Sequence, residues 1–385
     1  MIANDLAMRL AKKYAQPDKR FLDPFCGTAR TVMASAAFGM ESVGLDINPL
    51  AVLIARAKAA DVEVDELSSL LNRSTRGHRV DPLQFDLLPD RKVRWFSTKA
   101  QFELRQIVTW INRLQMSQAA RLMLAALLSA TAREVSYCRK GQWKLHRMIA
   151  KERRLYRSSG WDVFTRRLAR TILELKNESG LRAFSQIVLG DCTKLSENPE
   201  LSQLGPFDLV ITSPPYGDSH TTVSYGDVSA LCLGVLRHIR GIDTSHIPSR
   251  ALDNACLGGR KDNRPEATFN LSDYWAGGKT NEARARSEHF LTDLGASCRQ
   301  MNTVLAKKAD VVFVVSRRSA GGRRLYIDEF LKDTLAEIGF SLKATEARAI
   351  IGKATPAVVN ARGASCDTVL VNTMRQELVL SFARR

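Results

Sequence analysis

The sequence RFLDPFCGTARTVMASAAFGMESVGLD, residues 20–46, predicts a strand, a tight turn, a helix and a second strand in succession. The turn lies at residues 23–28 and contains a proline and a glycine, and the helix after it is rich in small residues. In such a unit the turn meets the helix N-terminus, where a ligand can approach the backbone closely. We therefore expect a mostly parallel, Rossmann-like α/β sheet with helices on both faces.

Two acidic residues in this unit favour one cofactor over another. A dinucleotide site would need a G-x-G-x-x-G turn to hold a pyrophosphate, whereas this turn has only Gly27 and carries Asp23, which would repel that group. The Asp23 carboxylate suits a ligand with an ammonium and a sulfonium. Asp46, at the tip of the second strand, is placed to accept hydrogen bonds from both hydroxyls of a ribose. These residues predict S-adenosylmethionine rather than NAD, and the alternative is a Rossmann-like unit that binds no ligand.

A second stretch, Thr212-Ser213-Pro214-Pro215-Tyr216, follows an apolar run at 207–211 that predicts a short buried strand. Proline fixes its own φ and restricts the residue before it, so the backbone carbonyls and the Ser213 hydroxyl point in fixed directions. Fixed acceptors beside an aromatic ring suit a planar base with an exocyclic amine, because the acceptors take its N–H bonds and Tyr216 stacks on it. The alternative is an ordinary exit from a strand into a loop.

Both stretches resemble motifs of the amino-group DNA methyltransferases, which use S-adenosylmethionine. Residues 23–28 resemble their DPFCGSGT cofactor loop, residues 44–49 resemble the motif that follows it, and residues 213–216 resemble their (D/N/S)PP(Y/F/W) motif. The order of these motifs implies a catalytic domain without circular permutation. One position departs from the pattern, because Ala29 stands where the family usually has a second glycine. If that position requires a positive φ, alanine is strained there by on the order of 1 kcal/mol.

The resemblance implies roles for particular residues. It assigns catalysis to Ser213, Pro214, Pro215 and Tyr216. It assigns cofactor contacts to the loop, to the tip of the second strand and to the end of a predicted strand at 186–189, which gives this set: Asp23, Phe25, Cys26, Gly27, Thr28, Asp46, Ile47, Asp191 and Cys192.

Further stretches resemble the N4-cytosine branch of the family found in restriction–modification systems. They are residues 133–148, residues 217–226 and the T-M-x-x-E sequence at 373–377. Serine at the first position of the catalytic motif is usual in the same branch, so the resemblance implies methylation of cytosine N4. Three alternatives remain: an N6-adenine DNA methyltransferase, an RNA base methyltransferase of the N2-guanine type, and a nucleic-acid-binding protein whose catalytic activity has decayed.

Charge predicts a polyanionic partner. The chain has 57 Lys and Arg against 40 Asp and Glu, a formal net charge of +17. Between residues 139 and 170 there are 11 basic residues and two acids, interleaved with Trp143, Tyr156, Trp161 and Phe164. We expect cations here to bind the phosphates of double-stranded DNA and aromatic rings to contact bases or sugars; the alternative is a solvated helix face. The candidate DNA-binding residues are Arg139, Lys140, Lys144, Arg147, Arg153, Arg154 and Arg157.

The basic run falls in a region where the α/β alternation stops. Helical patterns replace it, so we expect residues 65–184 to be a mostly helical insertion and the candidate DNA-binding region. Residues 1–64 and 185–385 then form a discontinuous S-adenosylmethionine-dependent catalytic domain.

Cysteine usage and hydropathy predict the cellular compartment. Seven scattered cysteines without a C-x-x-C pair are typical of reduced thiols rather than of disulfides or a zinc site, so we expect no metal. The longest apolar run, residues 122–132, is far below the roughly 20 residues that a membrane span needs, and no signal peptide is recognisable. We therefore expect a cytoplasmic protein with no membrane partner.

Overall fold

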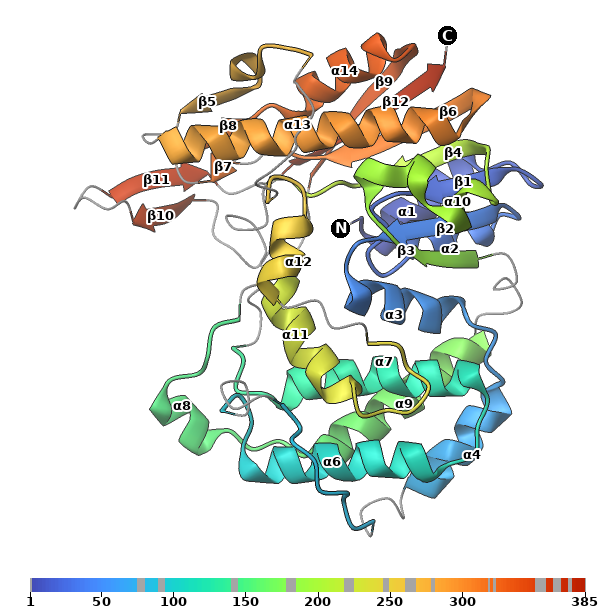
Figure 1. The fold of residues 1–385 in the computed structure, drawn as a ribbon, viewed down its shortest axis with the longest axis vertical. Coiled ribbons are helices and arrows are strands. Elements are labelled where there is room, and N and C mark those ends of the chain that lie inside the picture. The colour runs from blue at the N-terminus through green and yellow to red at the C-terminus, as the bar shows by residue number, and fades with distance from the viewer. Residues whose placement is uncertain are drawn as a thin grey trace. The chain divides into compact units, whose positions relative to one another are not determined.

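The computed structural model describes residues 2–74, 80–88, 94–139, 145–177, 185–217, 225–244, 249–259, 268–277, 281–317, 319–320, 323–349, 358–362, 368–372 and 376–384 (Figure 1). These residues form two compact units. The first comprises Met1–Ile47, Phe184–Val223 and Leu252–Arg385, and the second comprises Asn48–Ala183 and Ser224–Ala251.

The first unit is built on a seven-stranded sheet with the order β3-β2-β1-β4-β6-β12-β9. All of its strands run in one direction except β12, which is antiparallel to both of its neighbours. The strands are β1 (Arg20–Asp23), β2 (Glu41–Asp46), β3 (Ser185–Leu189), β4 (Phe207–Thr212), β6 (Leu305–Val315), β9 (Phe340–Ala349) and β12 (Gln376–Arg384).

This strand order confirms the predicted fold. Its first five strands follow the doubly wound order, in which the chain reverses direction across the sheet between β1 and β4. The reversed strand β12, inserted between β6 and β9, distinguishes the sheet from the all-parallel dinucleotide-binding sheet. The first unit is therefore a doubly wound, Rossmann-like sheet with one reversed strand.

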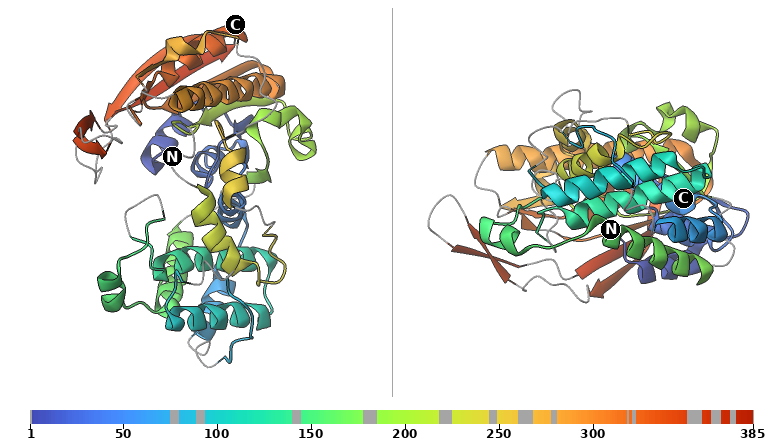
Figure 2. Two further views of the ribbon diagram at one scale, coloured as in Figure 1. Left: turned by 60° about the vertical axis from the view of Figure 1, so that its left-hand side comes forward. Right: turned by 90° about the horizontal axis from the view of Figure 1, so that it is seen from below.

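Helices cover both faces of this sheet. Neighbouring residues on a strand point to opposite faces, and both Phe21 and Leu22 of β1 are fully buried. On one face Leu22 belongs to a core that includes side chains of α13 and α14, and Figure 2 shows α13, in orange, lying along the sheet. The helices of this unit are α1 (Asn4–Tyr14), α2 (Arg30–Ala36), α10 (Pro199–Ser202), α13 (Asn281–Val304) and α14 (Ile327–Glu337), with 3₁₀ turns at Cys192–Glu197 and Leu271–Tyr274.

Two smaller sheets complete the first unit. β10 (Val358–Arg362) pairs with β11 (Thr368–Asn372), and β8 (Arg323–Leu325) pairs with β5 (Trp275–Gly277) and β7 (Ser319–Ala320). The boundary with the second unit falls within α12 (Ser249–Ala255).

The second unit is helical and has its own apolar core. Edge-on aromatic contacts join Trp110, Trp161 and Phe164 at its centre. Its helices are α3 (Pro49–Ala59), α4 (Val64–Ser74), α6 (Thr98–Arg113), α7 (Gln118–Val135), α8 (Ala150–Leu155), α9 (Gly160–Asn177) and α11 (Tyr225–Leu236). The described part of the expected insertion, 65–184, lies in this unit, which also takes in α3 and α11. Within the described ranges, no helix combines the length and the apolarity that crossing a membrane requires.

Candidate active site

Four neighbouring parallel strands end at the same edge of the sheet. Asp23 ends β1, Asp46 ends β2, Gly190 and Asp191 follow β3, and Ser213 follows β4. Ligands of doubly wound sheets bind outside the carboxyl ends of the strands, at the point where the strand order reverses. That point lies between β1 and β4, so the fold brings together the predicted cofactor loop and the predicted catalytic stretch.

Asp46 ties together the loops that follow β1 and β3. Its Oδ2 accepts a hydrogen bond of 2.9 Å from the Gly27 N–H, and its backbone carbonyl accepts one of 3.1 Å from the Gly190 N–H. Gly44 permits this arrangement, because a Cβ on that residue would lie 2.9 Å from the Cys26 side chain. The carboxylate of Asp46 is half-buried at the strand tip, where a ligand could still reach it.

Asp23 lies inside the protein, where it joins the predicted cofactor loop to strand β4. It is 3% exposed. Its Oδ1 accepts hydrogen bonds from the Phe25 N–H at 3.0 Å and from the Thr212 hydroxyl at 2.5 Å, and its Oδ2 accepts one from the Thr31 hydroxyl. Burial raises the pKa of this carboxyl to about 6, against the lowering effect of these bonds. The carboxylate would therefore contact a cofactor ammonium only in addition to the three hydrogen bonds that it already accepts.

The loop between these acids leaves room for a cofactor. A Cβ built on Gly27 would meet no atom within 4 Å, so the space beside that backbone is open. Phe25, Gly27 and Thr28 are all half-exposed, whereas Cys26 is buried. Burial raises the pKa of the Cys26 thiol well above its usual value, so this thiol is not a nucleophile at neutral pH. Open backbone flanked by carboxylates fits a cationic nucleoside cofactor.

Ala29, the N-cap residue that precedes α2, adopts the left-handed conformation, with φ 63° and ψ 34°. This backbone disfavours every residue except glycine, at a cost on the order of 1 kcal/mol for alanine. The position where the family usually has a second glycine therefore does require a positive φ in this chain, and the helix does not start earlier to avoid it.

The predicted contacts near β3 divide into an exposed and a buried part. Ile47 and Asp191 are half-exposed. Asp191 Oδ1 accepts hydrogen bonds from the backbone N–H and the hydroxyl of Thr193, at 2.9 and 2.8 Å. The Cys192 thiol is buried and lies 3.3 Å from the Ser297 hydroxyl of α13. A contribution of Cys192 to a cofactor site would come from its backbone.

In the predicted catalytic stretch the side chain of Tyr216 folds back onto that of Ser213. The Ser213 Oγ lies 3.1 Å from the Tyr216 hydroxyl oxygen, and that oxygen lies 3.5 Å from Oε1 of Glu377. Ser213, Pro215 and Tyr216 are half-exposed, and Pro214 is buried. Sequence reasoning did not single out Glu377, although the T-M-x-x-E sequence that contains it was a signal that could have pointed to this contact.

Five of the predicted DNA-binding residues are described, and all lie in the second unit. Lys140, Lys144 and the aromatic Trp143 lie outside the described residues. Helix α8, which carries Arg153 and Arg154, has no buried residue. The guanidinium groups of Arg147 and Arg153 lie 6.0 and 5.9 Å from the ring centre of Tyr137.

Arg139 and Arg157 already have partners within the protein. Arg139 forms an ion pair of 3.3 Å with Glu152, and Arg157 donates hydrogen bonds to the carbonyls of Arg154 and Tyr156. Burial, with the nearby charges of Arg153 and Arg94, lowers the pKa of Arg147.

The expectation that the interleaved aromatic residues contact bases is wrong for two of them. Trp161 and Phe164 are fully buried in the core of the second unit, where the Trp161 indole N–H donates to Gln106 Oε1 at 3.2 Å. They alternate with arginines along the chain but lie on the opposite face of α9. Their function is to hold that helix in place.

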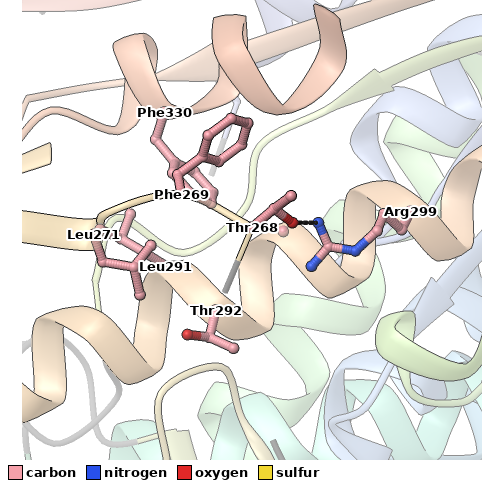
Figure 3. Close-up of a pocket in the computed structure, with 8 residues that line it drawn as sticks. Thr268, Phe269, Leu271, Leu291, Thr292, Arg299 and Phe330 are labelled. Atoms are coloured by element: carbon pink, nitrogen blue, oxygen red, sulfur yellow. Dashed lines mark hydrogen bonds between the residues drawn. The ribbon is translucent and has the colours of Figure 1, made fainter. Parts of the chain in front are cut away.

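A small pocket in the first unit is not the cofactor site. It lies between α13, α14 and the segment after residue 267, and Figure 3 shows Phe269, Phe330 and Arg299 around it. The Arg299 guanidinium donates to the Thr268 hydroxyl at 3.2 Å. The volume of about 10 Å³ corresponds to a single water molecule.

Comparison with known proteins identifies relatives of the chain. No protein-family model matches it. The type II methyltransferase M.MvaI of Kocuria varians is 29% identical over 331 residues, which cover 78% of this chain and 70% of that protein. The type II methyltransferase M.BsoBI of Geobacillus stearothermophilus is 24% identical over 287 residues, 66% of this chain and 53% of that protein. Among solved structures, TrmN from Thermus thermophilus matches with a TM-score of 0.33 and 10% identity, over 99% of this chain and 48% of that chain.

Sequence similarity and strand-end geometry lead to the same class of enzyme. The relatives are named as type II methyltransferases, and the sheet places an open glycine loop and two half-exposed acids at the edge where such a sheet binds its ligand. Together these findings support a methyltransferase of the restriction–modification kind whose methyl donor is S-adenosylmethionine.

Proposed function

We propose that this chain methylates double-stranded DNA, transferring a methyl group from S-adenosylmethionine to the exocyclic N4 of cytosine. The observation that carries the proposal is the bond of 2.5 Å from the Thr212 hydroxyl to Asp23 Oδ1. It fastens the start of the catalytic stretch to the start of the cofactor loop. A base amine held at Ser213 would therefore lie beside a methyl group held at Gly27.

The cofactor's role is to supply an electrophilic methyl group on its sulfonium. Asp46 would accept the ribose hydroxyls, Asp191 and the backbone of Cys192 would contact the adenine, and the open backbone at Gly27 would face the methionine portion. These roles follow from the half-exposed positions of the acids at the strand ends.

The catalytic stretch acts on the target amine. An aryl amine is a poor nucleophile because its lone pair is delocalised into the ring. Hydrogen bonds from its N–H groups to the Ser213 Oγ and the Pro214 carbonyl localise that lone pair on nitrogen, and they strengthen as positive charge develops there. The nitrogen lone pair would form the new C–N bond as the C–S bond breaks and its electrons stay on sulfur, and the nitrogen would then release its extra proton to water.

The base must leave the duplex to reach these acceptors. Enzymes that modify bases flip the target nucleotide into a pocket and hold it by stacking and by hydrogen bonds to its edge. The half-exposed ring of Tyr216 would provide the stacking surface.

The choice of cytosine rests on the serine. A serine hydroxyl is shorter than an Asp or Asn side chain and is neutral, so the amine must approach the backbone more closely, as a smaller pyrimidine can. The resemblance of residues 133–148 and 373–377 to the N4-cytosine branch supports the same choice.

The product identifies the target amine. We expect the protein, incubated with labelled S-adenosylmethionine and unmethylated duplex DNA, to yield labelled N4-methylcytosine when the DNA is digested and analysed by mass spectrometry. A matched incubation with RNA tests the RNA alternative. Label found only on adenine N6, or only on guanine in RNA, would contradict the assignment to cytosine.

We further propose that the surface around α8 binds DNA phosphates. Replacing Arg153, Arg154 and Arg157 with alanine is expected to weaken binding to duplexes of every sequence. It should also flatten the plot of log K against log salt, by about 0.9 in slope for each phosphate that the variant no longer neutralises. Fluorescence anisotropy at several salt concentrations measures both effects.

A control triple variant separates direct phosphate binding from overall charge. Arg73, Arg113 and Lys176 are exposed in the same unit, and their replacement by alanine removes the same net charge. The control should leave the slope near that of the wild type. Equal slopes for the two triple variants would show that α8 is only a solvated surface.

A further inference from the structure

The reversed strand β12 brings a buried carboxylate to the edge of the sheet that carries the catalytic stretch. Because β12 is antiparallel, it begins where the parallel strands end: Leu378 pairs with Val315, the last residue of β6. Glu377 is therefore placed just beyond the end of β6, and β6 is the strand next to β4 in the sheet. Its exposed fraction is only 9%.

Glu377 ends a series of polar contacts that starts at the catalytic serine. The Ser213 Oγ lies 3.1 Å from the Tyr216 hydroxyl oxygen, which lies 3.5 Å from Glu377 Oε1, the outer limit of a hydrogen bond. On its other side Glu377 Oε2 lies 3.6 Å from Nη1 of Arg348, and Nη2 of the same guanidinium donates to Asp5 Oδ2 at 2.8 Å. The arginine compensates the negative charge and holds the carboxylate in place.

The direction of the hydrogen bonds follows from chemistry. An ionised carboxylate can only accept, so the Tyr216 O–H donates to Glu377. The lone pairs of the tyrosine oxygen then accept the Ser213 O–H. With its proton directed towards Tyr216, the Ser213 oxygen presents lone pairs to whatever lies on its open side.

The direction of these hydrogen bonds matters because Ser213 must accept a hydrogen bond from the target amine. A free serine hydroxyl rotates and can donate or accept. The exocyclic amine of cytosine is a donor, so a serine proton turned towards it would oppose binding and would not localise the nitrogen lone pair.

We propose that Glu377 is a positioning residue, which acts through Tyr216 to hold the Ser213 hydroxyl as an acceptor for the target amine. The inference rests on the function proposed above. It assigns a role to the T-M-x-x-E sequence and gives Tyr216 a second role beside stacking.

Two single variants and their combination test this role. Tyr216→Phe keeps the ring and removes the hydroxyl. Glu377→Gln keeps the shape, but the Arg348 guanidinium can only donate, so the amide oxygen would face Arg348 and the NH₂ group would face Tyr216. The tyrosine oxygen would then have to accept, and its proton would turn towards Ser213. Each variant is expected to lower the single-turnover rate of methyl transfer about five- to tenfold, because each removes the effect of one hydrogen bond on the transition state. The dissociation constant for S-adenosylmethionine should not change. The double variant should be no slower than the slower single variant, because both changes break one series of contacts.

Glu346→Gln is the matched control. Glu346 lies on β9 and pairs with Lys13 rather than with the series, and its side chain is 42% exposed. This variant should react at the wild-type rate. A wild-type rate for Glu377→Gln, or rate losses that multiply in the double variant, would overturn the proposal.

A second measurement does not depend on methyl transfer. In urea unfolding, the shifts in midpoint caused by Tyr216→Phe and Glu377→Gln should not add in the double variant, because the two side chains are coupled. Additive shifts would show that the two side chains do not interact, whatever the enzyme methylates. Coupled shifts in a protein that methylates no cytosine would instead refute the proposed function and leave no acceptor role for Glu377.

Discussion

Replacing Asp46 with alanine is expected to weaken S-adenosylmethionine binding by about 10- to 150-fold, which corresponds to roughly 1.5–3 kcal/mol for hydrogen bonds to a charged group. The structure adds a second reason for a large effect. Asp46 Oδ2 also accepts the Gly27 N–H at 2.9 Å, so alanine releases the cofactor loop as well as the ribose. Isothermal calorimetry on folded variants measures the dissociation constant.

An asparagine at the same position separates the two contributions. Asp46→Asn keeps one oxygen, which can still accept the Gly27 N–H, but its NH₂ group cannot accept a bond from a ribose hydroxyl. We expect it to weaken binding less than alanine does, but still measurably. Asp61→Asn, at an exposed position in the second unit, serves as the control and should bind as the wild type does. If Asp46→Asn bound the cofactor with unchanged affinity, the carboxylate would have no contact with the ribose.

The second large effect concerns stability against pH. Burial raises the pKa of Asp23 to about 6 from an ordinary value of 3.8. Between these two pH values the unfolded chain has released the Asp23 proton, whereas the folded protein still holds it. The contribution of this group to the free energy of unfolding is therefore complete below about pH 4 and is lost as pH rises through about 6. The loss amounts to about 3 kcal/mol, since each unit of pKa shift is worth about 1.4 kcal/mol.

Asp23→Asn should remove this dependence. The amide oxygen can keep the bonds from Phe25 and Thr212, and the Thr31 hydroxyl can turn to accept from the amide nitrogen. In urea unfolding from pH 4 to 7, the stability of the variant relative to the wild type should rise by about 3 kcal/mol. Asp61→Asn should show no such trend. A constant difference across this range would mean that Asp23 ionises in the folded protein as it does in the unfolded chain.

The sequence predicted the sheet well because its signals are local. Strands expected at 20–22, 186–189 and 207–211 occur as β1, β3 and β4, within a residue of the predicted bounds. Each is a short apolar run bounded by turn residues, and burial on both faces makes such runs nearly continuous. The glycine loop after β1 fixed the place of the candidate cofactor site in the same way.

Features that depend on tertiary contacts were missed or misjudged. Helix α11 was not predicted, because it is apolar on nearly every side and shows no helical period. Trp161 and Phe164 were expected on the surface although their spacing, continued by Leu168, already marks the buried face of α9. Glu377 could not be connected with Tyr216, because 161 residues separate them along the chain.

The position of β12 has a consequence for how the chain folds. Residues 376–384 fill the gap between β6 and β9, so each of those strands keeps an unpaired edge until this segment has been synthesised. The edge of β6 is strongly apolar, with Val311 to Val315 all buried in the finished sheet. An open, apolar strand edge is a template for pairing with other chains. We therefore expect a stage of synthesis in which aggregation competes with closure of the sheet, and we expect pairing of the strand that carries Glu377 to end that stage.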